Sequence, residues 1–232
     1  DAAVLHPPSW DPRANEVSID AAKRYPDRLS VLGFFDAADP ASRQAIETWK
    51  QQPGMLGLRF AFLKPGTERW LFDGTLDWVW PAAERLGLPV GILVSNQSGM
   101  LPVIGDIAEK HPGLRLLIDH LGRRRHSVDD ASFADLDDML ALAKHPNVAI
   151  KATGAPSYST DVYPYRNIHP YIKRIFESFG PRRMFWGTDL TRMPCSYRQC
   201  VTMYTEEMPW LKGEDLELVM GRGICEWIGW KI

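Results

Sequence analysis

The chain has 232 residues, of which 45% are hydrophobic and 24% charged, and its 27 basic and 29 acidic side chains give a formal net charge of -2. This composition is that of an ordinary globular protein and excludes disordered, collagen-like and coiled-coil chains. Since no positive field would gather phosphates, we expect no nucleic-acid partner. Since no apolar run approaches about 20 residues, we expect no membrane partner. Three cysteines make no disulfide framework, which predicts a cytoplasmic protein.

Seven short apolar runs along the chain predict β-strands. Most of them carry apolar residues at consecutive rather than alternating positions, which is typical of strands covered on both faces in a parallel sheet. The seven runs are Ala2–Leu5, Leu29–Phe35, Leu56–Phe62, Val90–Val94, Leu114–Asp119, Val148–Ala152 and Met184–Gly187.

Longer amphipathic stretches with recognisable ends separate these runs. Asp39 followed by Pro40 predicts the start of a helix, because proline suits the first helical position. Gly87 predicts the left-handed end of another helix. Stripes of apolar residues at helical spacing complete the pattern. The predicted helices lie over residues 40–49, 81–86, 131–144, 171–179 and 216–227.

The alternation of strands and helices predicts a parallel sheet with right-handed helical crossovers. Such a sheet is either a closed barrel or a doubly wound open sheet. The Gly-rich turn that usually follows the first strand of the open nucleotide-binding folds is missing. We therefore predict a (β/α)8 TIM barrel in a single domain over residues 1–232. Because only seven strands are predicted, we expect the first β/α unit of the barrel to lie before Asp1.

Four charged or polar residues stand at the carboxyl ends of predicted strands, which is where a barrel carries its active site. His120 and Asp189 follow the fifth and seventh runs, and Arg59 and Lys151 lie within the third and sixth. Each charge in such a setting needs a partner or a ligand to offset its desolvation. We expect these residues to line an active site. A structural ion pair is the alternative for Arg59 and Lys151, and a structural core histidine is the alternative for His120.

Four segments carry a resemblance to a known family. They match, in the correct order, the fourth, sixth, seventh and eighth strands of the amidohydrolase-related (β/α)8 hydrolases. Within that family the chain is most similar to the branch of 2-pyrone-4,6-dicarboxylate lactonase and the sugar-acid lactonases, and the resemblance covers essentially the whole chain. The matching segments are Gly57–Phe60, Ile118–Arg123, Lys151–Gly154 and Trp186–Asp189.

The resemblance implies a hydrolase that opens a lactone or a similar cyclic ester of a small carboxylated substrate. Asp189 would be the general base for water, and His120 would polarise the carbonyl or orient the base. Guanidinium groups suit substrate carboxylates because they bind them through two hydrogen bonds. The loop after Lys151–Gly154, the segment that matches the family's seventh strand, lies at the correct end of the barrel to contact substrate. The predicted substrate-binding residues are Arg59, Arg123, Lys151 and Tyr158.

The metal content is open at this stage. The family places a His-x-His pair on its first strand, which we expect upstream of Ala2, and the run Val90–Val94 carries no histidine. His120 and Asp189 alone are too few ligands for a tight catalytic zinc site. The resemblance therefore implies either a divalent metal, zinc or manganese, completed by the upstream pair, or a reaction without metal. It also implies a small-molecule substrate and a homo-oligomer.

Two other functions compete with lactone hydrolysis. A related branch of the family consists of metal-dependent decarboxylases of small aromatic or unsaturated acids, and metal analysis discriminates it. A catalytically inactive barrel kept as a binding protein is the second. The presence of both His120 and Asp189 disfavours that second alternative.

Overall fold

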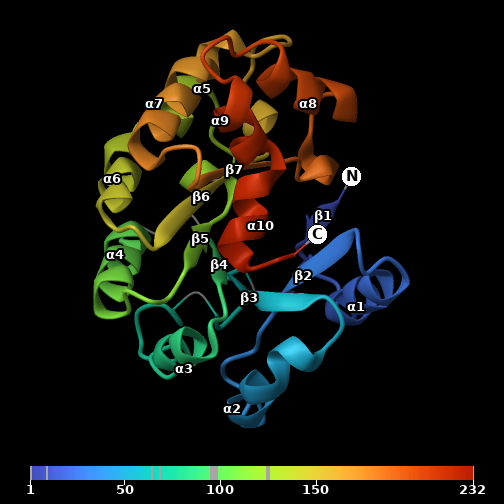
Figure 1. Ribbon diagram of the computed structural model, residues 1–232. Coiled ribbons are helices and arrows are strands. Elements are labelled where there is room, and N and C mark those ends of the chain that lie inside the picture. The colour runs from blue at the N-terminus through green and yellow to red at the C-terminus, as the bar shows by residue number, and fades with distance from the viewer. Residues whose placement is uncertain are drawn as a thin grey trace.

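The seven apolar runs form one parallel sheet in the computed structural model, which describes residues 2–8, 10–63, 65–67, 69–94, 99–123 and 126–231. Each strand pairs with the next one in chain order, and the sheet curls into the wall of a barrel (Figure 1). The prediction of a (β/α) barrel that contributes seven strands is confirmed. The strands are β1 (Ala3–Leu5), β2 (Leu29–Phe34), β3 (Met55–Ala61), β4 (Val90–Leu93), β5 (Leu116–Ile118), β6 (Val148–Thr153) and β7 (Met184–Gly187).

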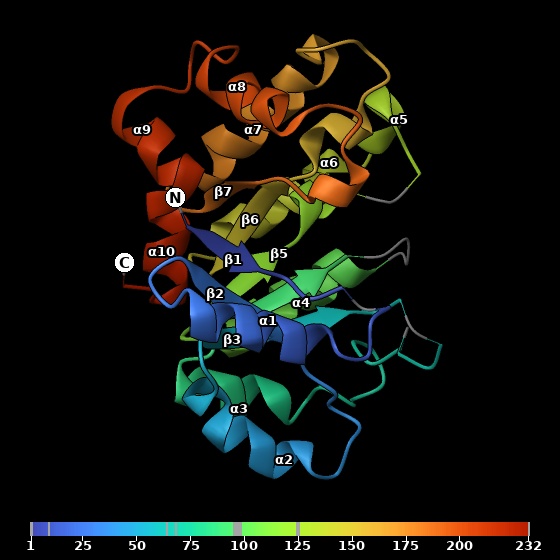
Figure 2. The ribbon, with the colours of Figure 1, turned by 90° about the vertical axis from the view of Figure 1, so that its right-hand side faces the viewer.

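Helices α1 to α7 surround the outside of this sheet (Figures 1 and 2). The left-handed helix end predicted at Gly87 is confirmed, with φ of 60°. Among the described residues, none of the helices combines the length and apolar character that crossing a bilayer requires. The helices are α1 (Ala14–Arg24), α2 (Ser42–Ala45), α3 (Val79–Leu86), α4 (Met100–Lys110), α5 (Asp129–Ser132), α6 (Leu136–Leu140), α7 (His169–Phe179), α8 (Tyr197–Thr205), α9 (Gly213–Glu217) and α10 (Gly223–Ile228). Tighter or wider turns are η1 (Ile46–Gln51), η2 (His120–Gly122), η3 (Ala141–Lys144), η4 (Ala155–Tyr158), η5 (Arg166–Ile168), η6 (Leu190–Arg192) and the π-helical η7 (Leu218–Arg222).

Both faces of the sheet are buried, which explains the apolar residues at consecutive strand positions. Successive residues of a strand point to opposite faces. Residues such as Val31 and Ile150 belong to the large core shared with the outer helices. The alternate positions face the inside of the barrel, where α10 packs against them. This inner cluster consists of Leu32, Leu117, Ala149, Phe185 and Ile228.

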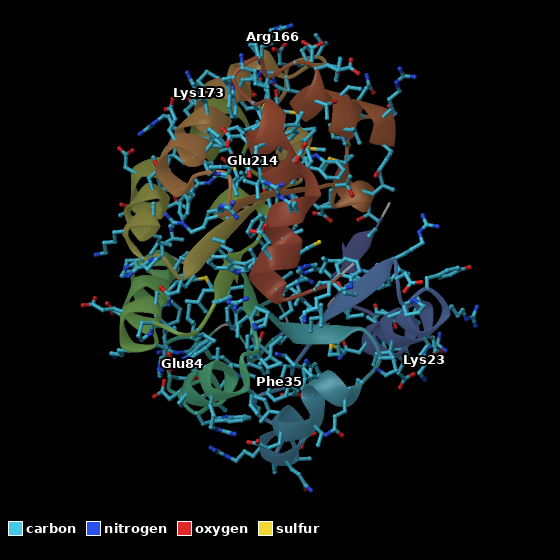
Figure 3. The ribbon with its side chains drawn as sticks, viewed as in Figure 1. Lys23, Phe35, Glu84, Arg166, Lys173 and Glu214 are labelled. Carbon is cyan, nitrogen blue, oxygen red and sulfur yellow. The ribbon has the colours of Figure 1, made fainter. Side chains whose placement is uncertain are left out.

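The outer helices carry charged side chains on their exposed surfaces and pack on buried aromatic rings. Lys23 and Lys173 are exposed on α1 and α7 (Figure 3). Phe35, just after β2, is only 4% exposed, and its ring meets the edge of the Trp49 ring at 5.2 Å between centroids. These contacts hold η1 against the first strands of the sheet.

The single helix predicted over Ala131–Lys144 is wrong. The chain leaves the helix after α5, starts again as α6 and tightens into η3. The apolar spacing over residues 131–144 is compatible with this break, because the apolar side chains of both short helices still face the core. The break presents the carbonyl of Ser132 and the carboxylate of Asp135 to Arg123, whose Nη1 donates to them over 3.1 and 2.6 Å. These hydrogen bonds stabilise the interrupted backbone.

Strands β1 and β7 are the two edges of the curled sheet, and among the described residues no ladder joins them. A cavity of about 1550 Å³ extends along this side of the molecule. It is lined by residues of both edge strands, by α10 and by the loops at the strand ends. The fold therefore places one large cavity between the edges and over the inner face of the sheet.

Candidate active site

The polar residues of the cavity follow the inner-face positions of the strands. Arg59 on β3, and Lys151 and Thr153 on β6, alternate with residues of the outer core, and Asp189 lies two residues past the end of β7. All four line the cavity together with His120. The prediction that Arg59, Lys151, His120 and Asp189 gather at one mouth of the barrel agrees with this arrangement.

A buried carboxylate holds the two cations of the cavity floor. Lys151 Nζ donates to Asp119 Oδ1 over 2.7 Å, and Arg59 Nε and Nη2 each lie 3.0 Å from Asp119 Oδ2. The Asp119 side chain is fully buried. Burial alone would raise its pKa, but the charges of Lys151 and Arg59 outweigh burial and hold the pKa of Asp119 well below its usual range. The cluster therefore carries two positive charges against one negative charge.

His6, which was not predicted from the sequence, joins this cluster from the end of β1. Its ring nitrogens lie 3.2 and 3.3 Å from Lys151 Nζ. Burial, followed by the charge of Lys151, lowers the pKa of His6 well below 6.5, so the imidazole is neutral. Arg59 Nη1 donates to the Pro7 carbonyl over 2.9 Å, which ties this segment to β3. The signal in the sequence is the first polar residue after an apolar strand, which is also the position of Asp119 after β5.

His120 and Asp189 face one another across the cavity. His120 Nε2 lies 3.7 Å from Asp189 Oδ2, and His120 Nδ1 makes a 2.7 Å hydrogen bond with Thr153 Oγ1. Burial lowers the pKa of His120 to about 4, since it outweighs the attraction of Asp119. The imidazole is therefore neutral near pH 7, and its Nε2 edge is available to a substrate atom placed beside Asp189.

Unusual backbone conformations aim these two side chains. His120 and Asp189 have φ of 53° and 54°, in the left-handed region that costs non-glycine residues about 1 to 3 kcal/mol. Gly187 allows β6 and β7 to approach closely, since a Cβ there would lie 2.5 Å from Thr153 Cγ2. This close approach leaves Thr153 in place to bond His120.

The structure corrects the expected placement of Arg123. Its side chain is fully buried behind the turn η2 and is not among the cavity-lining residues. Its Nε donates to the Leu121 carbonyl over 2.9 Å, and its Nη1 donates to Ser132 and Asp135. The guanidinium is captured by nearby backbone carbonyls and one carboxylate, because the turn directs it away from the cavity. Arg123 therefore supports the turn that carries His120 and is not placed to grip a substrate.

Tyr158, another predicted substrate-binding residue, lies just behind the cavity wall. It is 1% exposed, and its side chain interacts with the guanidinium of Arg192. Burial raises the pKa of Tyr158, so its phenol keeps its proton. Arg192, which the sequence analysis missed, stands between this ring and the cavity. Its guanidinium lies 5.8 Å from the Tyr158 ring centroid, and its Nη1 lies 3.3 Å from Asp189 Oδ2.

The donor set of the cavity bears on the question of a metal. A catalytic zinc site takes three protein ligands and one water. Within the described parts of the chain, no group of three or more His, Cys, Asp or Glu side chains is arranged to hold an ion. His120 and Asp189 supply two donors, and the next imidazole, that of His6, contacts the Lys151 ammonium. The described side chains alone therefore do not fit a three-ligand zinc site.

The chain is similar in sequence to known proteins. The amidohydrolase family model matches residues 3–218. The chain is 26% identical over 171 residues to the L-fucono-1,5-lactonase of Burkholderia ambifaria, covering 74% of this chain and 58% of that protein. It is 29% identical over 193 residues to the 4-sulfomuconolactone hydrolase of Hydrogenophaga intermedia, covering 80% of this chain and 58% of that protein.

A solved structure shows the same fold. An amidohydrolase from Burkholderia multivorans, solved with zinc bound, has a TM-score of 0.83 at 17% identity and covers 98% of this chain and 83% of that chain. The chain spans 58% of the length of each of the two curated relatives named above. Because the family model matches nearly all of its residues, the chain belongs to the amidohydrolase family.

Proposed function

We propose that this chain hydrolyses a lactone or a similar cyclic ester of a small molecule. The observation that carries the proposal is the pair of His120 Nε2 and Asp189 Oδ2, 3.7 Å apart in a cavity whose floor holds two cations. A base, a hydrogen-bond donor and a positive field are the three elements that water attack on a carbonyl requires. The hydrolase activities of the curated relatives support the same reaction class.

Asp189 is the general base in this proposal. Its carboxylate accepts a proton from water, and the water oxygen bonds to the carbonyl carbon of the ring ester. The resulting tetrahedral oxyanion collapses as the ring C–O bond breaks. Asp189 returns the proton to the leaving ring oxygen, and the product is a hydroxy acid. The Asp189 side chain lines the cavity and is 23% exposed, so water can reach its carboxylate. The distance of 3.7 Å to His120 is of a kind that often shortens when substrate binds.

His120 holds the carbonyl oxygen. With Thr153 donating its hydroxyl proton to Nδ1, the neutral ring of His120 carries its own proton on Nε2 and donates it to the carbonyl oxygen. A pKa of about 4 keeps the ring neutral at the start of the reaction. Lys151 lies on the cavity floor beside them: burial lowers its pKa, and the Asp119 carboxylate opposes that shift and favours the ammonium, which would stabilise the developing oxyanion.

Replacing Asp189 by Asn tests the assignment. Asn tolerates the left-handed backbone of this position, so the fold should persist while the base is lost. We expect kcat/KM on a panel of five- and six-membered lactones, neutral and carboxylated, to fall about 1000-fold. The matched control is Asp137→Asn, because Asp137 is 85% exposed and pairs only with Arg174 among the described residues.

Circular dichroism and the urea unfolding midpoint should be unchanged in both variants. Turnover by Asp189→Asn within tenfold of the parent would remove Asp189 from the role of base. Tight binding of lactones by the parent without hydrolysis would instead support a non-catalytic binding barrel.

A further inference from the structure

Two cysteines that follow η6 lie in contact and take no part in the proposed reaction. Cys195 Sγ and Cys200 Sγ are 3.6 Å apart, and both residues carry free thiols. The two sulfur atoms of a disulfide lie about 2.05 Å apart, so this pair needs to approach by only about 1.5 Å. Oxidation of the pair to a disulfide therefore requires little movement of the chain.

The start of α8 brings the two thiols together. Ser196 caps this helix, because its Oγ accepts from the Gln199 amide over 3.3 Å and its own amide donates to Gln199 Oε1 over 3.1 Å. Cys195 precedes the cap and Cys200 is the fourth residue of the helix, and side chains at these two positions meet at a capped helix start. Apolar residues often occupy them. Two thiols pack there in the same way and can also be oxidised.

The surroundings give the two thiols different roles. Cys195 is partly exposed, and the Tyr165 hydroxyl interacts with its sulfur. Cys200 is 2% exposed, and burial raises the pKa of its thiol to about 12. Cys200 therefore keeps its proton and can donate it to Cys195, as the Tyr165 hydroxyl can. Hydrogen-bond donors favour negative charge on a sulfur atom, and the thiolate is the form that reacts with oxidants.

The pair lies behind one wall of the cavity. Trp186 Nε1 donates to the Cys200 carbonyl over 3.2 Å. The Tyr197 ring, two residues after Cys195, meets the Trp186 ring edge-on at 6.4 Å between centroids, and both residues line the cavity. A bond between Cys195 and Cys200 would therefore fix the first turn of α8, which carries one of these rings and accepts a hydrogen bond from the other.

We propose that Cys195 and Cys200 form a site of reversible oxidation, at which a hydroperoxide joins the two thiols in a disulfide that fixes this wall of the cavity. The Cys195 thiolate attacks one peroxide oxygen, the O–O bond breaks, and the other oxygen takes a proton and leaves, as water when the oxidant is hydrogen peroxide. Cys195 is then a sulfenic acid. The site is independent of the proposed lactone hydrolysis.

The second step closes the disulfide. The Cys200 sulfur bonds to Cys195 Sγ, and the Cys200 proton goes to the hydroxyl group that leaves as water. The two sulfur atoms together lose two electrons, which the peroxide gains. Exchange with an external dithiol reverses the reaction and returns both thiols.

Peptide mapping after oxidation tests the site. The parent protein is treated with excess hydrogen peroxide near pH 7, alkylated in urea and cleaved with trypsin. Cleavage after Arg192 and Arg198 places the two thiols in separate peptides, Met193–Arg198 and Gln199–Lys212. We expect these peptides to be recovered as one disulfide-linked product, formed at least about tenfold faster than any oxidised form of Cys225. Dithiothreitol should return the two free peptides.

Cys225→Ala is the matched control, because Cys225 is also a partly exposed free thiol and lines the cavity. It should form the same linked product at the same rate as the parent. In Cys200→Ala the product should be lost, and Cys195 should stop as a sulfenic acid that dimedone labels. In Cys195→Ala, the buried Cys200 should stay a thiol. A linked product that contains Cys225, or no disulfide between Cys195 and Cys200, would overturn the inference.

Hydrogen exchange tests the effect on the cavity wall. The amides of Gln199 and Cys200 donate to Ser196 in the first turn of α8. We expect both amides to exchange at least about fivefold more slowly in the oxidised parent than in the reduced parent. Cys195→Ala treated with the same peroxide cannot form the disulfide and should show no such change. Equal or faster exchange in the oxidised parent would contradict a disulfide that fixes this turn.

Discussion

Asp119 is the residue that fixes the two cations at the floor of the cavity. A buried ion cluster contributes little net stability, because desolvation of its charges offsets their attraction. The arrangement of Asp119 with Lys151 and Arg59 is therefore not explained by stability alone. Its effect is to fix two cations at the floor of the cavity and to leave a net positive charge there. Such a preorganised charge favours the oxyanion of the proposed reaction.

His120 gives the stability of the protein a defined pH dependence. Its pKa is about 4 in the folded chain and 6.5 ordinarily, so the unfolded chain binds more protons between these values. The neutral His120 therefore contributes to the free energy of unfolding in full above pH 6.5. This contribution is lost as the pH falls toward 4. From pH 7 to pH 5 the loss from this one group is about 2 kcal/mol. We expect His120→Asn to reduce the pH dependence of the free energy of unfolding by that amount.

Urea unfolding at pH 7 and pH 5 measures this difference. Asn can place a polar atom near the position of Nδ1 and so keep a hydrogen bond to Thr153. His6 and His169 also have lowered pKa values, so part of the dependence persists in the variant. The same pH dependence in parent and variant would show that His120 is not neutralised by burial.

At the scale of the element, the turn η2 is the feature that brings His120 into the cavity. His120, Leu121 and Gly122 have φ of 53°, 56° and 64°, three left-handed residues in succession. Only the last is glycine, so the turn is strained. Arg123 opposes this strain by bonding the Leu121 carbonyl from one side and the broken helix at Asp135 from the other. Arg123, which was expected to bind substrate, thus affects the site by supporting the backbone that positions His120.

Arg123→Met tests this support. Methionine fills much of the volume but donates none of the hydrogen bonds, so we expect the free energy of unfolding to fall by about 3 kcal/mol. We also expect kcat to fall about tenfold at temperatures where the variant is folded, with little change in KM, because His120 is displaced and the substrate contacts remain. The control is Arg174→Met, whose exposed pair with Asp137 is worth less than about 1 kcal/mol. A tenfold rise in KM with kcat unchanged would instead return Arg123 to the substrate site.

The elements themselves were predicted from the sequence to different degrees. The strands were predicted well because burial on both faces makes their runs continuously apolar, and a continuous run is a strong local signal. The break between α5 and α6 was not predicted. The apolar stripe there has the same spacing in one helix and in two short ones. The hydrogen bonds at the break come from Arg123, which lies outside the stripe, nine residues before Ser132.

At the scale of the whole molecule, the position of the site could be predicted but not its full membership. Parallel strands in chain order bring all carboxyl ends together, which located His120 and Asp189. His6 was missed although the strand before it was predicted, because its place in the site depends on a contact with Lys151, 145 residues away in the chain. Arg192 was missed because it lies in the three-residue turn η6, which is too short for any periodicity to relate its side chain to the cavity.

The open side of the sheet leads to a prediction about local stability. Strand β1 has three residues, is partly exposed and pairs only with β2 among the described residues, whereas β4 is fully buried between β3 and β5. Amide exchange of a central strand requires nearly global unfolding, while an edge strand beside a cavity opens locally. We expect the amides of Val4 and Leu5 to exchange at least about 100-fold faster than those of β4, as measured by hydrogen exchange with NMR or mass spectrometry at pH 7.

Strand β7 should be intermediate, because η7 and α10 pack against it. Protection of β1 equal to that of β4 would contradict an open edge and would mean that another segment covers this side of the barrel.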